Sequence, residues 1–273
     1  MQLENKVCLI AGASGTIGSA LAERFYDAGA RLALTHLARE IRPARWQNQN
    51  ENRILECQLD ICDRRDVEAK VRQVRDYFGR LDVLVNCTGR LGPVGPTSEV
   101  STDDWVRAVE TNFVGAFYLT RAVLDVMVPY SRGKIIHFSG GGAAYARPFY
   151  SAYSSSKAAL VRFSESLAEE LRDRNIDVNT IAPGPVESGM WDELRSFKSP
   201  DDRTVAELKK MDESGGVSPL VAADLAVFLA SDRSNGLTGR LISAVWDPWS
   251  SFDQRINEIM NSEAGTLRRV PLS

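Results

Sequence analysis

The chain has 273 residues, of which 44% are apolar and 25% charged, proportions typical of a globular domain with a substantial core. Its formal net charge of -3, from 33 basic and 36 acidic residues, gives no electrostatic basis for binding nucleic acid or an anionic membrane. Neither an apolar run of about 18 residues nor a signal-like segment interrupts the sequence, so we expect one cytoplasmic domain over residues 1–273.

Short apolar runs alternate with amphipathic segments along the chain. The apolar runs, suited to buried strands, cover residues 6–11, 31–36, 54–59, 81–85, 134–138, 177–181 and 241–245. The amphipathic segments, with apolar residues at helical spacing, cover residues 17–28, 64–78, 102–128, 152–174 and 218–230. This alternation predicts an α/β fold, a single-domain, Rossmann-like, doubly wound parallel sheet of about seven strands with helices on both faces. Its ligand is expected beyond the carboxyl ends of the strands.

The first predicted strand leads through a glycine-rich turn into the first predicted helix. The turn reads Ala11-Gly12-Ala13-Ser14-Gly15-Thr16-Ile17-Gly18. Glycine lets a backbone come close to a pyrophosphate, and a helix N-terminus offers free N–H groups and the positive end of its dipole. We therefore expect Gly12, Ser14, Thr16, Ile17 and Gly18 to hold the phosphates of a dinucleotide, the alternative being an ordinary glycine-rich turn.

A phenol and an ammonium group lie one helical turn apart in the segment Tyr153-Ser-Ser-Ser-Lys157. Residues at positions i and i+4 share one face of a helix. A cation held near a tyrosine favours the phenolate and lowers the pKa of the phenol from its usual value of about 10. The pair is therefore a candidate for proton transfer, although the same spacing also occurs on ordinary surface helices.

The glycine turn and the Tyr153 pair stand in the order found in one known family. The chain resembles the short-chain dehydrogenase/reductase family over about residues 6–245. Gly12 and Gly18 match the first and last glycines of the family's T-G-x-x-x-G-x-G turn, whereas Thr16 stands where its middle glycine is usual. The resemblance implies a nicotinamide dinucleotide and hydride transfer between nicotinamide C4 and a carbonyl or secondary alcohol, with Tyr153 exchanging the proton.

Further matches imply roles for residues that follow other strands. Asp60 resembles the aspartate that binds the adenine amine, and Ile61 is its backbone neighbour. Asn86 and Gly89 are the ends of a segment whose centre differs from the family's N-N-A-G. Asn112 resembles the asparagine that supports a water relay to the active-site lysine.

The segment after the sixth strand resembles the family's P-G-x-V-x-T motif. Pro183, Gly184 and Val186 match it, and Ser188 stands at its last position. The resemblance implies that the Val186 backbone and the Ser188 hydroxyl hold the nicotinamide carboxamide, while Lys157 binds the nicotinamide ribose and lowers the Tyr153 pKa.

One position departs from the family in a way that matters for chemistry. The family has a serine thirteen residues before its active tyrosine, and Gly140 stands there in this chain, with Ser139 one residue earlier. Either a small backbone adjustment brings Ser139 to the substrate carbonyl, or the Ser139 side chain points into the strand layer. Loss of one oxyanion donor costs on the order of 10²–10³ in rate.

The end of the second strand carries the information on coenzyme choice. An acidic residue there would bind the adenosine ribose and repel a 2′-phosphate. The chain has His36 at this place, with Arg39, Arg42 and Arg45 after it. The missing carboxylate and the nearby guanidinium groups favour NADP over NAD. In the alternative, these arginines form an exposed helix face and the enzyme uses NAD.

Two segments are expected to shape the substrate side. Residues 187–216 would form a lid, whose apolar residues either pack on the lid itself or contact the substrate. These residues are Met190, Trp191, Leu194 and Phe197. Residues 246–273 form a C-terminal extension that is too apolar for a free tail, so we expect it to pack on the body or on a neighbouring subunit. Its apolar residues include Trp246, Trp249, Phe252, Ile256 and Ile259.

These matches together predict an NADP-dependent carbonyl reductase or alcohol dehydrogenase acting on a small molecule, without a metal, since the four cysteines lack paired metal-site spacing. The expected catalytic residues are Asn112, Ser139, Tyr153 and Lys157. One alternative is an enzyme that modifies a sugar or cyclitol; another is a dinucleotide-binding regulator without turnover, supported by Gly140 and Thr16. The resemblance further implies a homodimer or homotetramer formed through residues 102–128 and 152–174.

Overall fold

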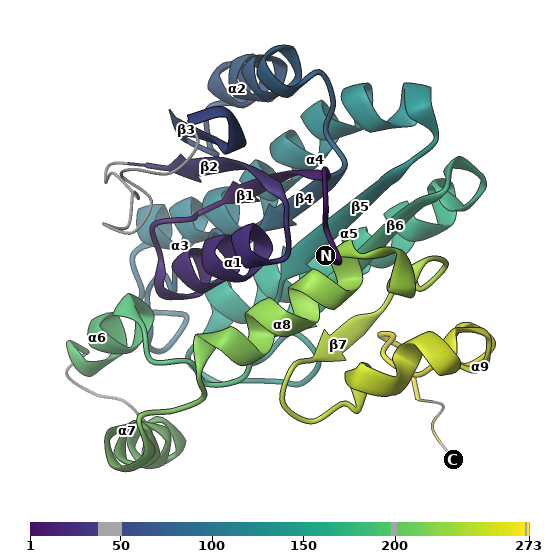
Figure 1. Cartoon of the computed structure of the whole chain (residues 1–273). Coiled ribbons are helices and arrows are strands. Elements are labelled where there is room, and N and C mark those ends of the chain that lie inside the picture. Colours follow the sequence, from purple (N-terminus) through teal and green to yellow (C-terminus); the bar gives the residue numbers. More distant parts are fainter. Residues whose placement is uncertain (38–50, 198–200, 271, 273) are drawn as a thin grey trace.

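The computed structural model describes residues 1–37, 51–197, 201–270 and 272, and within them seven strands form one parallel sheet (Figure 1). The strands are β1 Val7–Ala11, β2 Arg31–His36, β3 Ile54–Gln58, β4 Val83–Asn86, β5 Gly133–Phe138, β6 Ile176–Ala182 and β7 Leu241–Ser243. Their order is β3-β2-β1-β4-β5-β6-β7, which confirms the predicted doubly wound fold. The chain turns to opposite sides of the sheet after β1 and β3, so the crevice between β1 and β4 is the topological switch point.

Helices cover both faces of this sheet (Figure 1). On one face α1 Thr16–Asp27 packs against α8 Pro219–Ala230; on the other lie α2 Arg64–Phe78, α4 Gly115–Met127 and α5 Ser151–Glu170. Side chains of a strand alternate between faces, so Ile10 of β1 joins the first core cluster and its neighbour Leu9 joins the second. Burial on both sides explains why the strands read as continuous apolar runs.

The long helix predicted at residues 102–128 contains a change of pitch. It begins as α3 Thr102–Val109, passes through a π-helical turn at Glu110–Val114, and continues as α4. Within the described part of the chain, Thr102–Tyr130 is the one helical stretch long and apolar enough to cross a membrane by length and composition, a test that core helices also pass. The π-turn holds Asn112, and such turns occur frequently at functional sites.

The segments that follow β6 and β7 form additional helices. The predicted lid contains α6 Gly189–Arg195 and α7 Asp202–Ser214, whereas the C-terminal extension contains a 3-10 helix at Trp249–Gln254 and α9 Ile256–Met260. Five apolar residues of the extension belong to or pack against the first core cluster, namely Trp249, Phe252, Ile256, Ile259 and Met260. Trp246, by contrast, is 73% exposed. The strand before it is shorter than predicted because the Asp247 carboxylate and the Ser243 hydroxyl accept bonds from backbone N–H groups and form a turn.

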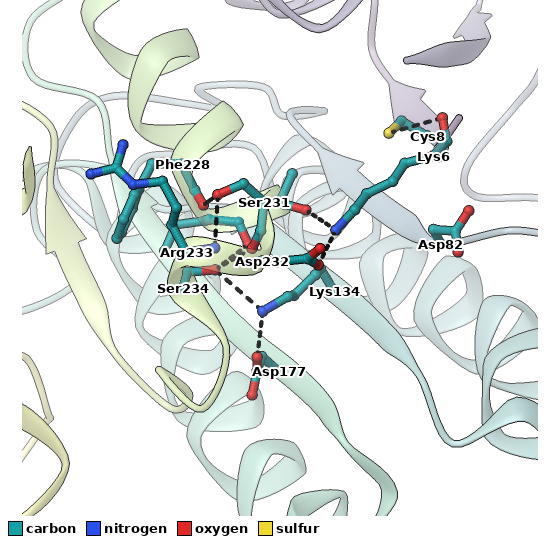
Figure 2. Close-up of polar contacts among 12 residues, drawn as sticks. Lys6, Cys8, Asp82, Lys134, Asp177, Phe228, Ser231, Asp232, Arg233 and Ser234 are labelled. Carbon is teal, nitrogen blue, oxygen red and sulfur yellow. Dashed lines mark hydrogen bonds and ion pairs between the residues drawn. The ribbon is translucent and has the colours of Figure 1, made fainter. Parts of the chain in front are cut away.

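Ion pairs hold the elements together at the amino ends of the strands (Figure 2). Lys134 Nζ lies 2.6 Å from Asp177 Oδ2, and Lys6 Nζ lies 2.7 Å from Asp232 Oδ1. Three of these residues, Lys6, Lys134 and Asp232, line a cavity of about 310 Å³. Because this cavity lies at the amino ends of the strands, it is separate from the edge where the sequence places the dinucleotide.

Candidate active site

The glycine turn after β1 lies against the segment that follows β4, at the switch point of the sheet. Gly12 has a φ of +83°, and a Cβ there would lie 3.1 Å from both Cγ2 and N of Thr88. A Cβ at Gly18 would overlap the Gly12 carbonyl oxygen and lie 2.7 Å from Ala13 Cα. Glycine at both positions lets the turn, the next strand and helix α1 come together.

The N-terminus of α1 is available to an anion. Its N-cap is Gly15, so no side chain caps the first N–H groups of the helix. Ser14 and Thr16 are exposed and Ile17 is half-buried. Threonine in place of the family's middle glycine at position 16 therefore leaves an exposed side chain beside the turn. The helix end keeps the free N–H donors that a pyrophosphate needs.

Tyr153 and Lys157 lie on the buried face of α5, as their spacing predicts. They are 9% and 3% exposed, and Lys157 Nζ lies 5.9 Å from the centre of the Tyr153 ring. Lys157 Nζ also donates a hydrogen bond of 2.8 Å to the carbonyl oxygen of Phe138, the last residue of β5. A Cβ at Gly89 would lie 3.2 Å from Lys157 Nζ and 3.4 Å from Asn112 Oδ1, so these predicted site residues are brought together.

The electrostatic state of this pair corrects one expectation. Burial raises the pKa of Tyr153 to about 12, although the positive charge of Arg147 acts in the opposite direction. Burial also shifts the pKa of Lys157, which for an ammonium group means a fall, to about 8. The predicted lowering of the Tyr153 pKa by Lys157 is therefore wrong for the protein without ligand, because the loss of hydration outweighs the nearby charge. The phenol is protonated at neutral pH.

Asn112 is held by the backbone of the neighbouring loop. Its Oδ1 accepts from the N–H of Arg90 and its Nδ2 donates to the carbonyl of Arg90, both at 2.9 Å. Nδ2 also lies 3.0 Å from Ser156 Oγ, and that hydroxyl donates to the Tyr153 carbonyl oxygen at 2.9 Å. Asn112 therefore connects the loop after β4 to the helix that carries Tyr153 and Lys157. The water relay implied by the resemblance remains a prediction.

Gly140 lies directly against the Tyr153 hydroxyl. A Cβ at Gly140 would overlap Tyr153 Oη and lie 2.8 Å from Cζ, so the volume of a side chain at this position is already taken. Ser139 is 4% exposed; its N–H donates to the Ile181 carbonyl at 2.8 Å, and its buried hydroxyl has no partner among the described residues. A buried hydroxyl without a partner calls for a ligand or water, which keeps both interpretations of Ser139 open.

The residues that follow β3 and β4 lie at the same edge of the sheet. The Asp60 carboxylate is exposed and accepts a 2.9 Å bond from the N–H of Cys62, while Ile61 is buried. Asn86 is also buried, and its Oδ1 accepts a 2.6 Å bond from the Thr88 hydroxyl. This bond holds Thr88, the residue that lies next to Gly12.

The predicted nicotinamide segment follows β6. Gly184 has a φ of +82°, and a Cβ there would lie 2.7 Å from Val245 Cγ2, which explains the glycine after Pro183. Val186 is buried and pairs with Gly216 in an isolated bridge. Ser188 is the N-cap of α6, but its hydroxyl makes no capping bond and is available to a ligand.

The end of β2 gives partial information on the coenzyme. His36 ends the strand, and its Nε2 lies 3.4 Å from Oε1 of Glu56 on the neighbouring β3. Arg39, Arg42 and Arg45 lie outside the described residues. The interpretation based on their charges therefore stays a prediction.

The lid packs against an apolar cluster that includes Tyr153. A small apolar cluster contains Tyr153 together with Leu91, Tyr150 and Leu194, and four residues of α6 and α7 or next to them pack against it. These four are Met190, Trp191, Phe197 and Leu208. The lid residues named from the sequence thus pack in or against the cluster that contains Tyr153, rather than only on one another.

Four polar residues that the sequence did not indicate connect the loop before α5 to α7. Arg147 forms an ion pair with Glu207, and the Tyr150 hydroxyl lies 2.8 Å from Thr204 Oγ1. The partners are 60 and 54 positions apart in the sequence, and none of the four belongs to a motif, so no local pattern identifies them.

Comparison with known proteins agrees with this geometry. The family model described as short chain dehydrogenase matches residues 6–199. The 3-oxoacyl-acyl-carrier-protein reductase FabG of Thermotoga maritima is 30% identical over 89% of this chain and 97% of its own length. Oxidoreductase UcpA of Salmonella typhimurium is 35% identical over 87% of this chain and 92% of its own length.

Solved structures agree as well. The structure of ElxO with NADP bound has a TM-score of 0.76 and 27% identity, covering 88% of this chain and 96% of that one. An actinorhodin polyketide ketoreductase variant with NADPH has a TM-score of 0.77 and 27% identity, covering 87% and 95%. Taken with the glycine turn and the Tyr153 cluster, these matches identify the chain as an oxidoreductase that belongs to the short-chain dehydrogenase family.

Proposed function

We propose that the protein is an NADP-dependent carbonyl reductase in which Tyr153 donates the proton. The observation that supports this proposal most directly is the buried Tyr153 hydroxyl, which lies against Gly140. Tyr153 and Lys157 belong to the same helix, α5. Burial holds its pKa near 12, so the phenol carries its proton at neutral pH, as reduction of a carbonyl requires. The reverse oxidation would first need the phenolate and is expected to become faster as pH rises.

The residues around Tyr153 suit the other parts of this reaction. Bound NADPH would supply the hydride to the carbonyl carbon. Lys157, which the structure holds 2.8 Å from the Phe138 carbonyl, would bind the nicotinamide ribose, and the Ser188 hydroxyl would hold the carboxamide. The Ser139 hydroxyl, which has no partner in the described part of the chain, would donate a hydrogen bond to the substrate oxygen on which charge builds.

The glycine turn and the comparisons support the choice of coenzyme class. Gly12 and Gly18 pack closely against each other in the turn, and the start of α1 has no side-chain cap. Both features suit a pyrophosphate. Structural relatives are described as holding NADP or NADPH. We accordingly assign NADP to this protein, with NAD as the less favoured coenzyme.

The lid favours a carbonyl with apolar surroundings over a polyol. The cluster around Tyr153 presents Leu91, Leu194, Met190 and Trp191, and each hydroxyl of a sugar would lose its hydration there. This observation ranks the sugar or cyclitol alternative below a ketone reductase.

A substrate panel tests the proposed activity. NADPH oxidation would be followed with apolar ketones, 3-oxo thioesters and keto sugars of similar size. We expect turnover with at least one of the first two classes and kcat/KM at least tenfold lower with keto sugars. Turnover with keto sugars alone would contradict the substrate class, and inactivity with all three would support the regulator alternative.

Coenzyme preference is expected to depend on one charge-assisted contact. NADPH should bind about 10- to 100-fold more tightly than NADH, because a hydrogen bond between a guanidinium and the 2′-phosphate is worth about 1.5–3 kcal/mol. Arg39→Met should remove most of this difference by weakening NADPH alone. Fluorescence titration of both coenzymes measures it, with Arg121→Met on the outer surface of α4 as a matched control. A wild-type preference for NADH would overturn the assignment.

The assembly state is proposed from an exposed aromatic surface. Phe117 on α4 is 43% exposed, and its ring lies 6.0 Å from that of Phe163 on α5, which also lies 6.1 Å from Phe113. Such a surface supports a homodimer or homotetramer formed through these two helices, in a protein that we propose to be cytoplasmic. Sedimentation analysis measures the assembly state, and a monomer at micromolar concentration would contradict this proposal.

A further inference from the structure

The guanidinium of Arg147 is enclosed beside the reaction centre. Its side chain is only 14% exposed and stacks on the Tyr150 ring at 4.0 Å from the centroid. One nitrogen pairs with Glu207 of α7, while its buried Nε has no partner among the described residues. A cation in such surroundings interacts strongly with neighbouring groups, because little water screens it.

Arg147 and Tyr153 contact adjacent residues of one glycine run. A Cβ at Gly140 would overlap the Tyr153 hydroxyl oxygen, and a Cβ at Gly141 would lie 3.0 Å from Arg147 Nη1. A larger residue at either position would separate the two side chains from the loop. The glycines therefore bring the guanidinium and the phenol to the same short piece of backbone.

Among the described residues, Lys157 and Tyr145 are the other ionisable groups to consider beside Tyr153. Lys157 lies on its own helix, 5.9 Å from the ring centre, and Tyr145 lies on the same loop as Arg147. On α7, Glu207 pairs with Arg147, and the lid residues that belong to or pack against the cluster containing Tyr153 are apolar. Arg147 is the foremost charge that lowers the pKa of Tyr153, while a charged Tyr145 would raise it. Arg147 is therefore a cation that acts on this phenol from the same glycine run that Tyr153 contacts.

We propose, on the basis of the reductase activity proposed above, that Arg147 is a positioning residue for the proton of Tyr153. When Tyr153 gives its proton to the oxygen of the reduced carbonyl, a phenolate remains at a site that burial makes unfavourable for charge. The Arg147 guanidinium, which keeps all its protons, stabilises that phenolate.

Glu207 distinguishes this role from a purely mechanical one. Arg147 and Glu207 also connect the active-site loop to the lid, so either partner could matter only as a latch. A latch is broken equally by removing either charge. An electrostatic effect has opposite signs, because loss of Arg147 removes a positive charge and loss of Glu207 removes the negative charge that partly offsets it.

The test compares Arg147→Met with Glu207→Gln. Fluorinated tyrosine, whose phenol ionises at lower pH, would be incorporated, and the Tyr153 signal would be followed by 19F NMR and assigned with Tyr153→Phe. We expect the ionisation constant of Tyr153 to fall about tenfold or more in Arg147→Met and to rise in Glu207→Gln. Arg147→Lys, which keeps the charge, should lie nearer to wild type. Lys209→Met, which removes an exposed cation from the same lid helix, should leave the titration unchanged.

Activity gives an independent readout. The pH profile of kcat/KM for reduction should shift in opposite directions in the two variants, with Arg147→Met about 10- to 100-fold slower at neutral pH. Shifts of the same sign, or none, would overturn the role of Arg147 even if the enzyme reduces ketones. Opposite shifts in a protein that reduces no carbonyl would leave this inference standing and overturn the proposed function. If Arg147→Met does not fold, the direction in which Glu207→Gln shifts the Tyr153 ionisation constant still decides whether the effect is electrostatic.

Discussion

Tyr153→Phe is expected to lower kcat for carbonyl reduction by about 10²- to 10⁴-fold while changing the affinity for NADPH by no more than a few-fold. The phenol is the donor whose removal leaves the developing alkoxide without a proton. The ring of phenylalanine retains the packing against Leu91 and Leu194, so the fold and the lid should persist. Single-turnover kinetics would measure the chemical step, and equilibrium titration would measure the coenzyme affinity.

An exposed tyrosine serves as the matched control. Tyr130 is 72% exposed at the far end of the long helix, and Tyr130→Phe should leave both measurements unchanged. Retention of most of the wild-type kcat in Tyr153→Phe would show that another group supplies the proton.

Gly140→Ser is expected to lower kcat/KM by about 100-fold or more, although it restores the residue usual in the family. The new Cβ would overlap Tyr153 Oη, so the phenol must move by a substantial part of an ångström or more, and a misplacement of about 1 Å can cost 10²-fold. Gly140→Ala separates this steric effect from that of the hydroxyl, because it adds the Cβ alone. Both variants should lose activity and keep NADPH binding. Faster turnover in Gly140→Ser than in the wild type would contradict the structure of this loop.

Ser139→Ala completes the same experiment. Loss of a hydroxyl that contacts the substrate oxygen should lower kcat/KM by up to 10²–10³-fold. If the Ser139 side chain only fills the strand layer, the substitution should leave kcat/KM within a few-fold of wild type. The comparison decides between the two interpretations of Ser139 that the buried, partnerless hydroxyl leaves open.

Much of the fold could be predicted from the sequence because its signals are local. A strand covered on both faces must be apolar along its length, so the runs at β1, β4 and β6 are visible without knowledge of their partners. The glycine turn is equally local, since Gly12 needs a positive φ and close approach to its neighbours. The i, i+4 spacing of Tyr153 and Lys157 fixed their common helix face.

The sequence by itself therefore determined the family and the parallel sheet, and it predicted which residues gather at the carboxyl edge of that sheet. Only the tertiary structure decided how that edge behaves, because burial and long-range contacts have no local pattern. The ion pair of Arg147 with Glu207 joins residues 60 positions apart. The position of Gly140 against the Tyr153 hydroxyl depends on how a loop meets a helix. The high pKa of Tyr153 follows from its loss of hydration in the fold, which outweighs the charges that the sequence placed nearby.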